Sequence, residues 1–147
     1  MLYLTPYSAI AIVLRTAGFA SIQFRRNEST FMRSIIIHGI DDARIAAAAA
    51  RSLGVGVRLT SAPGAVSYGG AAWFAEIIAL VRAEFPDVAI DAILDCGDAP
   101  GHAMAALRTG VTSIRFTGPR RVRDKLEALA HDLGATLEES DTPQESG

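Results

Sequence analysis

The sequence predicts an α/β protein built on a mostly parallel sheet. Three observations indicate this class. Short apolar, often β-branched runs alternate with helical patterns from residue 34 to residue 138. Glycines and prolines separate most of these segments, and five predicted strands are divided by four predicted helices. Such an order requires parallel pairing with right-handed crossovers, which either an open doubly wound sheet or part of a (β/α)8 barrel satisfies.

The first strand and the first helix have clear signals. Residues 35–37 are three consecutive isoleucines, a run that favours a strand. Asp41 and Asp42 then offer N-terminal caps for an alanine-rich helix over 43–53, and Gly54 ends that helix. The pattern predicts one complete strand–helix unit at the start of the domain.

A second unit follows, and it contains the longest loop. We expect a strand over 55–60, then a loop over 61–70 that is rich in Gly, Ser and Pro and long enough to carry a function. A helix over 71–85 comes next, and Pro86 ends it. Its apolar face consists of Trp73, Ile77, Leu80 and Val81.

The remaining units are more compact. Strands are predicted over 88–94 and 111–116, with a helix over 99–109 between them that Gly110 follows. Gly118-Pro119 opens the last helix, which carries the apolar residues Val122, Leu126, Leu129 and Leu133. Gly134 ends that helix, residues 135–138 form a fifth strand, and residues 139–147 read as a disordered polar tail.

Composition narrows the class of protein. The chain has 147 residues, enough for one domain with a substantial core, and a net charge of -2 gives no electrostatic reason to expect nucleic acid or an anionic membrane as partner. The single cysteine excludes an intrachain disulfide, and the three histidines show no zinc-finger spacing. We therefore expect a cytoplasmic protein.

Residues 1–33 differ from the rest and are interpreted as an N-terminal extension outside the domain. Their apolar run, residues 9–14, is far shorter than the roughly 20 residues of a membrane span, and no positive charge precedes it as in a signal peptide. Met32 stands directly before the first clear strand. Our interpretation is that residues 1–31 reflect an upstream start for a protein that begins at Met32, whereas a peptide covering residues 4–15 from the native protein would exclude this.

The main candidate for a functional motif is Leu94-Asp95-Cys96-Gly97, where an apolar strand ends in a carboxylate, a thiol and a glycine. Functional side chains gather at the carboxyl ends of strands in β/α proteins. The alternative is structural: Asp98 and Pro100 start the next helix, and Asp95 faces solvent.

These residues resemble the class II (metal-dependent) fructose- and tagatose-bisphosphate aldolases over about 35–138. In that family a serine and a glycine-alanine turn follow a strand, as in Ser61-Ala62-Pro63-Gly64-Ala65, and a tyrosine and glycine come next, as in Tyr68-Gly69. A later strand ends Leu-Asp-His-Gly, which is similar to Leu94-Asp95-Cys96-Gly97. The resemblance implies the first half of a (β/α)8 TIM barrel, with about five βα units, since a complete barrel takes about 250 residues.

The resemblance also implies roles for individual residues. Asp95 takes the place of the proton-transfer aspartate, and Cys96 takes that of a zinc-ligating histidine. The family's other zinc histidines and its phosphate-binding loops belong to the half of the barrel that this chain lacks. Glu138 matches the first of two family glutamates, but Ser140 replaces the second. A zinc site therefore requires a composite of two chains, because catalytic zinc takes three protein ligands.

The remaining candidates have structural alternatives. Cys96 also fits a small core residue, and no adjacent Lys or His is evident to lower its pKa. His102 and His131 fit helix ends. Three arginines gather at the helix start that follows Gly118: Arg120, Arg121 and Arg123. An anion could bind there, but we favour a solvated charged face, because runs of surface charge are common.

Two functions remain open. The first is a degenerate, non-catalytic aldolase-like half-barrel that binds a sugar-phosphate-like or other anionic small molecule through Ser61, Gly64, Gly97 and Gly118, with Asp95 beside it. The second is a lyase whose zinc site is completed by a second chain. Exposed sheet edges favour a homodimer under either hypothesis.

Overall fold

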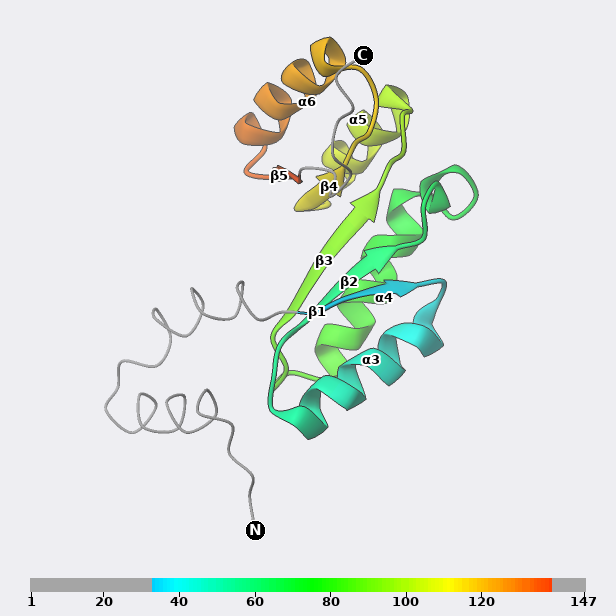
Figure 1. The fold of residues 1–147 in the computed structure, drawn as a ribbon, viewed down its shortest axis with the longest axis vertical. Coiled ribbons are helices and arrows are strands. Elements are labelled where there is room, and N and C mark those ends of the chain that lie inside the picture. Colours follow the sequence, from blue (N-terminus) through cyan, green and yellow to red (C-terminus); the bar gives the residue numbers. More distant parts are fainter. Residues whose placement is uncertain (1–32, 139–147) are drawn as a thin grey trace, which may run out of the picture.

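The computed structural model describes residues 33–138, so the interpretations of residues 1–32 and 139–147 concern parts of the chain outside the described residues. The chain alternates strands and helices throughout (Figure 1). The strands are β1 (Arg33–Ile37), β2 (Val57–Ser61), β3 (Ile90–Asp95), β4 (Ser113–Arg115) and β5 (Thr136–Glu138). The helices are α3 (Ile40–Leu53), the 3₁₀ turn η1 (Ala65–Ser67), α4 (Gly70–Glu84), α5 (Pro100–Thr109) and α6 (Arg120–Asp132).

The sheet confirms the predicted fold class and decides between the two architectures. All pairings are parallel, and the spatial order β1-β2-β3-β4-β5 is the order along the chain. In a doubly wound sheet, the order in which strands are added reverses at a switch point. In a βα barrel, each strand lies beside the one before it in the sequence. Five strands in sequential order therefore form a half-barrel, with β1 and β5 at its edges.

One face of the sheet packs against the helices and contains the core. Register pairs such as Leu59↔Ala92 and Leu94↔Ile114 place buried side chains of neighbouring strands on this face. Phe74 of α4 and Leu126 of α6 belong to the same hydrophobic cluster. Right-handed crossovers between sequential strands put every helix on this side, which explains why one face is apolar.

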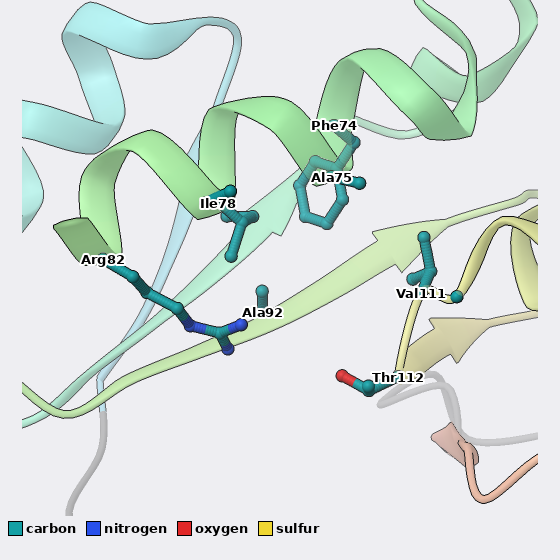
Figure 2. Close-up of a pocket in the computed structure, with 9 residues that line it drawn as sticks. Phe74, Ala75, Ile78, Arg82, Ala92, Val111 and Thr112 are labelled. Carbon is teal, nitrogen blue, oxygen red and sulfur yellow. The ribbon is translucent and has the colours of Figure 1, made fainter.

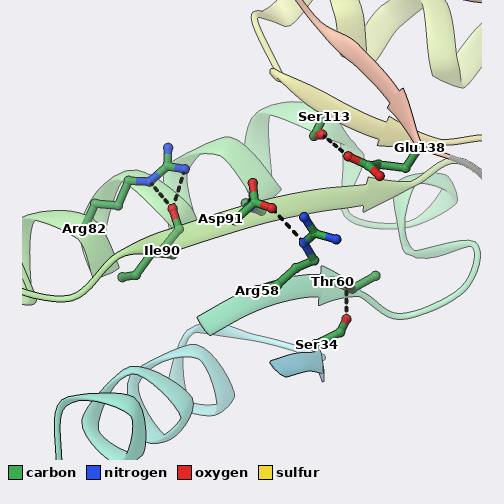
Figure 3. A network of polar contacts seen from close by, with 9 residues as sticks. Ser34, Arg58, Thr60, Arg82, Ile90, Asp91, Ser113 and Glu138 are labelled. Carbon is green, nitrogen blue, oxygen red and sulfur yellow. Dashed lines mark hydrogen bonds and ion pairs between the residues drawn. The ribbon is translucent and has the colours of Figure 1, made fainter. Parts of the chain in front are cut away.

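The opposite face, called the concave face below, carries polar contacts between neighbouring strands, which Figure 3 shows. Arg58 Nε donates to Asp91 Oδ2 at 2.7 Å, and the Ser34 and Thr60 hydroxyls share a hydrogen bond of 3.0 Å. Alternate strand positions on this face therefore carry polar groups that pair across neighbouring strands. Ile36 is an exception, since it is 54% exposed.

Four strands begin one or two residues later than the sequence pattern predicts, and β2, β4 and β5 do so for a shared reason. Each helix before them ends at a glycine in the left-handed conformation, and the next residue donates its N–H back to the helix. These bonds are Val55→Ala50, Val111→Ala106 and Ala135→Ala130. The apolar residue after each glycine thus completes a helix cap instead of opening a strand. Among residues 33–138, no helix is both long and apolar enough to cross a membrane.

Candidate ligand site at the carboxyl edge of the sheet

The carboxyl ends of the strands meet at one edge, and the structure brings Ser61 and Asp95 together there. Ser61 ends β2 and Asp95 ends β3, and both are buried. Ser61 Oγ accepts the backbone N–H of Asp95 at 2.9 Å. The serine that the sequence assigned to ligand binding therefore fixes the backbone that carries the carboxylate.

The Asp95 side chain turns the chain that follows it. Asp95 Oδ1 accepts the N–H of Gly97 at 2.9 Å, and Gly97 has φ +56°, a conformation that favours glycine. The carbonyl of Gly97 accepts the N–H of Thr117 at 2.8 Å, so the turn after β3 is tied to the turn after β4. One Asp95 oxygen thus accepts a structural hydrogen bond, while the carboxyl group has further acceptor capacity.

A row of charged residues crosses the concave face at this edge. Asp95 of β3 is in register with Arg115 of β4, and Arg115 is in register with Glu138 of β5. Neighbours in register share a face, so Arg115 stands on the same face as Asp95 and Glu138, at the strand position between them. Ser113 Oγ bonds Glu138 Oε1 at 3.4 Å. Arg123 of α6 donates from its two Nη atoms to the backbone oxygens of Phe116 and Glu138, each at 3.2 Å, and holds the ends of β4 and β5 together.

Gly64 and Gly118, which the sequence predicts to bind a ligand, both have structural roles. Gly64 opens η1, where its carbonyl accepts the N–H of Ser67 at 3.0 Å. Gly118 packs against the ring of Phe116 so closely that a Cβ would overlap it. Gly118 thus allows the turn before α6 to lie directly on the core.

Cys96 lies on the other side of the sheet from the charged row. It is 1% exposed, belongs to the hydrophobic cluster, and its Sγ approaches the carbonyl of Leu94 at 3.7 Å. Burial, with a smaller contribution from the Asp95 charge, raises the pKa of this thiol to about 12. Zinc binds the thiolate, so this placement makes metal binding by Cys96 unfavourable.

The histidines lie apart from one another. His38 follows β1, where Asp42 Oδ2 accepts its N–H at 2.8 Å and lies 3.3 Å from its Nδ1. His102 stands in the first turn of α5 and His131 in the last turn of α6. Within residues 33–138, no group of three or more His, Cys, Asp or Glu side chains is placed to hold a metal ion.

Sequence reasoning missed the charged residues inside the strands. Arg58, Asp91 and Arg115 interrupt apolar runs at positions that point to the concave face. The available signal was a charge at alternate positions of a strand, which indicates a polar second face. A comparison of the whole sequence with known proteins adds no assignment to this site, because no protein-family model and no curated protein sequence matches the chain.

Proposed function

We propose that the protein is a non-catalytic, class II aldolase-like half-barrel that binds a small phosphorylated or otherwise anionic molecule at the carboxyl edge of its sheet. The observation that carries the proposal is the charged row of the concave face, with Arg115 between Asp95 and Glu138. The aldolase resemblance of the Leu94–Gly97 motif supports the choice of a sugar-phosphate-like ligand.

The chemistry of the row suits such a ligand. A guanidinium presents parallel N–H donors that match the oxygens of a phosphate or carboxylate. The flanking carboxylates of Asp95 and Glu138 can accept hydrogen bonds from ligand hydroxyl groups. The turn at Gly97 borders this edge, and a Cβ there would meet open space, so the backbone can lie close to a bound molecule.

The test is an NMR titration with inorganic phosphate and with dihydroxyacetone phosphate. We expect saturable shifts at the amides of Gly97, Arg115 and Gly118. Arg115→Met should weaken binding about tenfold or more, because a charged hydrogen-bond donor is lost. Arg108→Met removes an exposed arginine of α5 and serves as the matched control. Shifts that stay linear to about 10 mM, or equal effects of the two variants, would overturn the proposal.

A second candidate is a metal-dependent aldolase completed by a second copy of the chain. It is favoured by the position of Asp95 at the carboxyl end of β3 and by the position of β1 and β5 at the two edges of the sheet that residues 33–138 form. Native mass spectrometry distinguishes the two functions, since this candidate requires a dimer with stoichiometric zinc. It further requires retro-aldol turnover that Asp95→Asn abolishes while the far-UV spectrum stays unchanged.

A further inference from the structure

A wedge-shaped pocket opens between β3 and β4, away from the carboxyl edge. β3 begins at Ile90, but β4 joins it only at Leu94↔Ile114 and Asp95↔Arg115. Along the first half of β3, the chain approaching β4 stays apart. The pocket is the space left between the two, with α4 as its roof (Figure 2).

The size of the pocket comes from small residues. Its volume is about 140 Å³. Phe74, Ile78 and Val111 form the larger apolar walls. The small lining residues are alanines of α4 and β3 and a glycine before β4: Ala75, Ala79, Ala92 and Gly110. A cavity of about 150 Å³ lined by apolar side chains accommodates benzene, so one aromatic ring fits here.

Arg82 gives the pocket its charge. In Figure 2 its guanidinium reaches from α4 toward β3, beside Ala92. Arg82 Nη2 donates to the carbonyl of Ile90 at 2.9 Å and Nε donates to the same oxygen at 3.3 Å. A guanidinium has five N–H groups, so this anchoring leaves donors for a ligand. No acidic side chain is among the residues that line the pocket, and the hydroxyl of Thr112 adds a polar group at its rim.

We infer that this pocket binds a small aromatic carboxylate, with the ring between Ile78 and Val111 and the carboxylate on Arg82. An apolar chamber with one arginine at its mouth complements a planar apolar body that ends in an anion. The inference does not depend on the proposed function, because the pocket residues and the charged row share no member.

Benzoate is the probe, and benzyl alcohol, its neutral analogue, measures the contribution of charge. In NMR titrations we expect benzoate to shift the signals of Ile78, Ala92 and Val111 with a Kd near 1 mM, as its small size implies. Benzyl alcohol should bind about tenfold more weakly. Arg82→Met should reduce benzoate binding to the level of benzyl alcohol, whereas Arg108→Met should leave it unchanged.

Filling the pocket provides an independent test. Ala75→Leu places a larger side chain in the pocket and should abolish benzoate binding, whereas Ala72→Leu changes an exposed position of the same helix and should not. Circular dichroism confirms that each variant folds. Equal affinity for benzoate and benzyl alcohol, shifts confined to the carboxyl edge, no saturable shift to about 20 mM, or undiminished binding by the filled variant would each overturn the inference.

Discussion

The thiol of Cys96 is the most perturbed titratable group described in this protein, because its surroundings are apolar and Asp95 is next to it. With its pKa raised to about 12, almost none of it is thiolate near neutral pH. We predict that iodoacetamide at pH 8 alkylates folded Cys96 at least about a hundredfold more slowly than the thiol in urea. Mass spectrometry of quenched samples measures both rates, and rapid alkylation of the folded protein would show that the thiol is accessible.

The same shift links stability to pH. In the folded protein the thiol stays protonated up to about pH 12, whereas its ordinary pKa is 9.0. Between these values the unfolded chain has lost a proton that the folded chain retains, so the free energy of unfolding falls as pH rises. We expect Cys96→Ala to flatten this decline between pH 9 and pH 10.5 in urea titrations. An unchanged slope would assign the decline to other groups.

Individual residues also show how much of the candidate site could be predicted from the sequence. The position of Asp95 and Gly97 was predictable, since a charged residue and a glycine that follow an apolar strand indicate the carboxyl edge of the sheet. The partnership of Asp95 with Ser61 was not, because it depends on strand register across 34 residues of chain. Arg115 was missed for the same reason, since only the sheet places it between Asp95 and Glu138.

At the scale of elements, the turn between β4 and α6 is fixed by the contact of Gly118 with the ring of Phe116. Phe116 is fully buried, so its ring cannot move without disturbing the core. We predict that Gly118→Ala lowers the free energy of unfolding by about 1–3 kcal/mol, as overpacking does. Gly101→Ala is the control, because a Cβ there meets open space. Equal denaturation midpoints would mean that the ring adjusts.

The ion pair on the concave face joins β2 to β3 and tests how the sheet tolerates charge. Arg58 and Asp91 are both partly exposed, and Asp91 Oδ1 also accepts the N–H of Ala92 at 3.0 Å. A double-mutant cycle with Arg58→Met and Asp91→Asn should give a coupling energy of about 1 kcal/mol. The losses of stability in the two single variants should add up to more than the loss in the double variant, because each single variant leaves one charge without its partner. Additive effects would show that the pair contributes nothing.

The pattern of apolar residues predicted which segments form strands and which form helices, but it did not predict where the strands begin. The apolar residues Val55, Val111 and Ala135 look like strand starts, yet each donates a hydrogen bond back to the preceding helix. Cap and strand compete for the same residue, and the left-handed glycine before it decides the competition. The periodicity of apolar residues cannot show which of the two forms, because the capping hydrogen bond joins residues that are five positions apart.

For the whole molecule, the sequence predicted a parallel sheet but not whether the sheet is open or closes into a barrel with a second chain. Within residues 33–138, the sequential strand order defines a half-barrel with β1 and β5 as its edge strands. An edge strand presents unpaired backbone groups, and parallel strands of two copies can satisfy them by pairing β5 of one with β1 of the other. Ile36 of β1 would lie at that junction, and its 54% exposure is unusual for an isoleucine in a strand.

We therefore predict that the protein is a dimer in sedimentation velocity at about 100 μM, a concentration that populates interfaces with micromolar dissociation constants. Ile36→Lys should convert it to a monomer, because lysine on an edge strand opposes strand pairing between chains. Leu80→Lys is the matched control: Leu80 is 43% exposed on α4, which packs against β3, the central strand. If the unmodified chain sediments as a monomer, or if both variants dissociate equally, the β1 edge does not hold two copies together. A dimer lost only in the Ile36 variant would place the second copy at this edge and make the composite zinc site worth assaying.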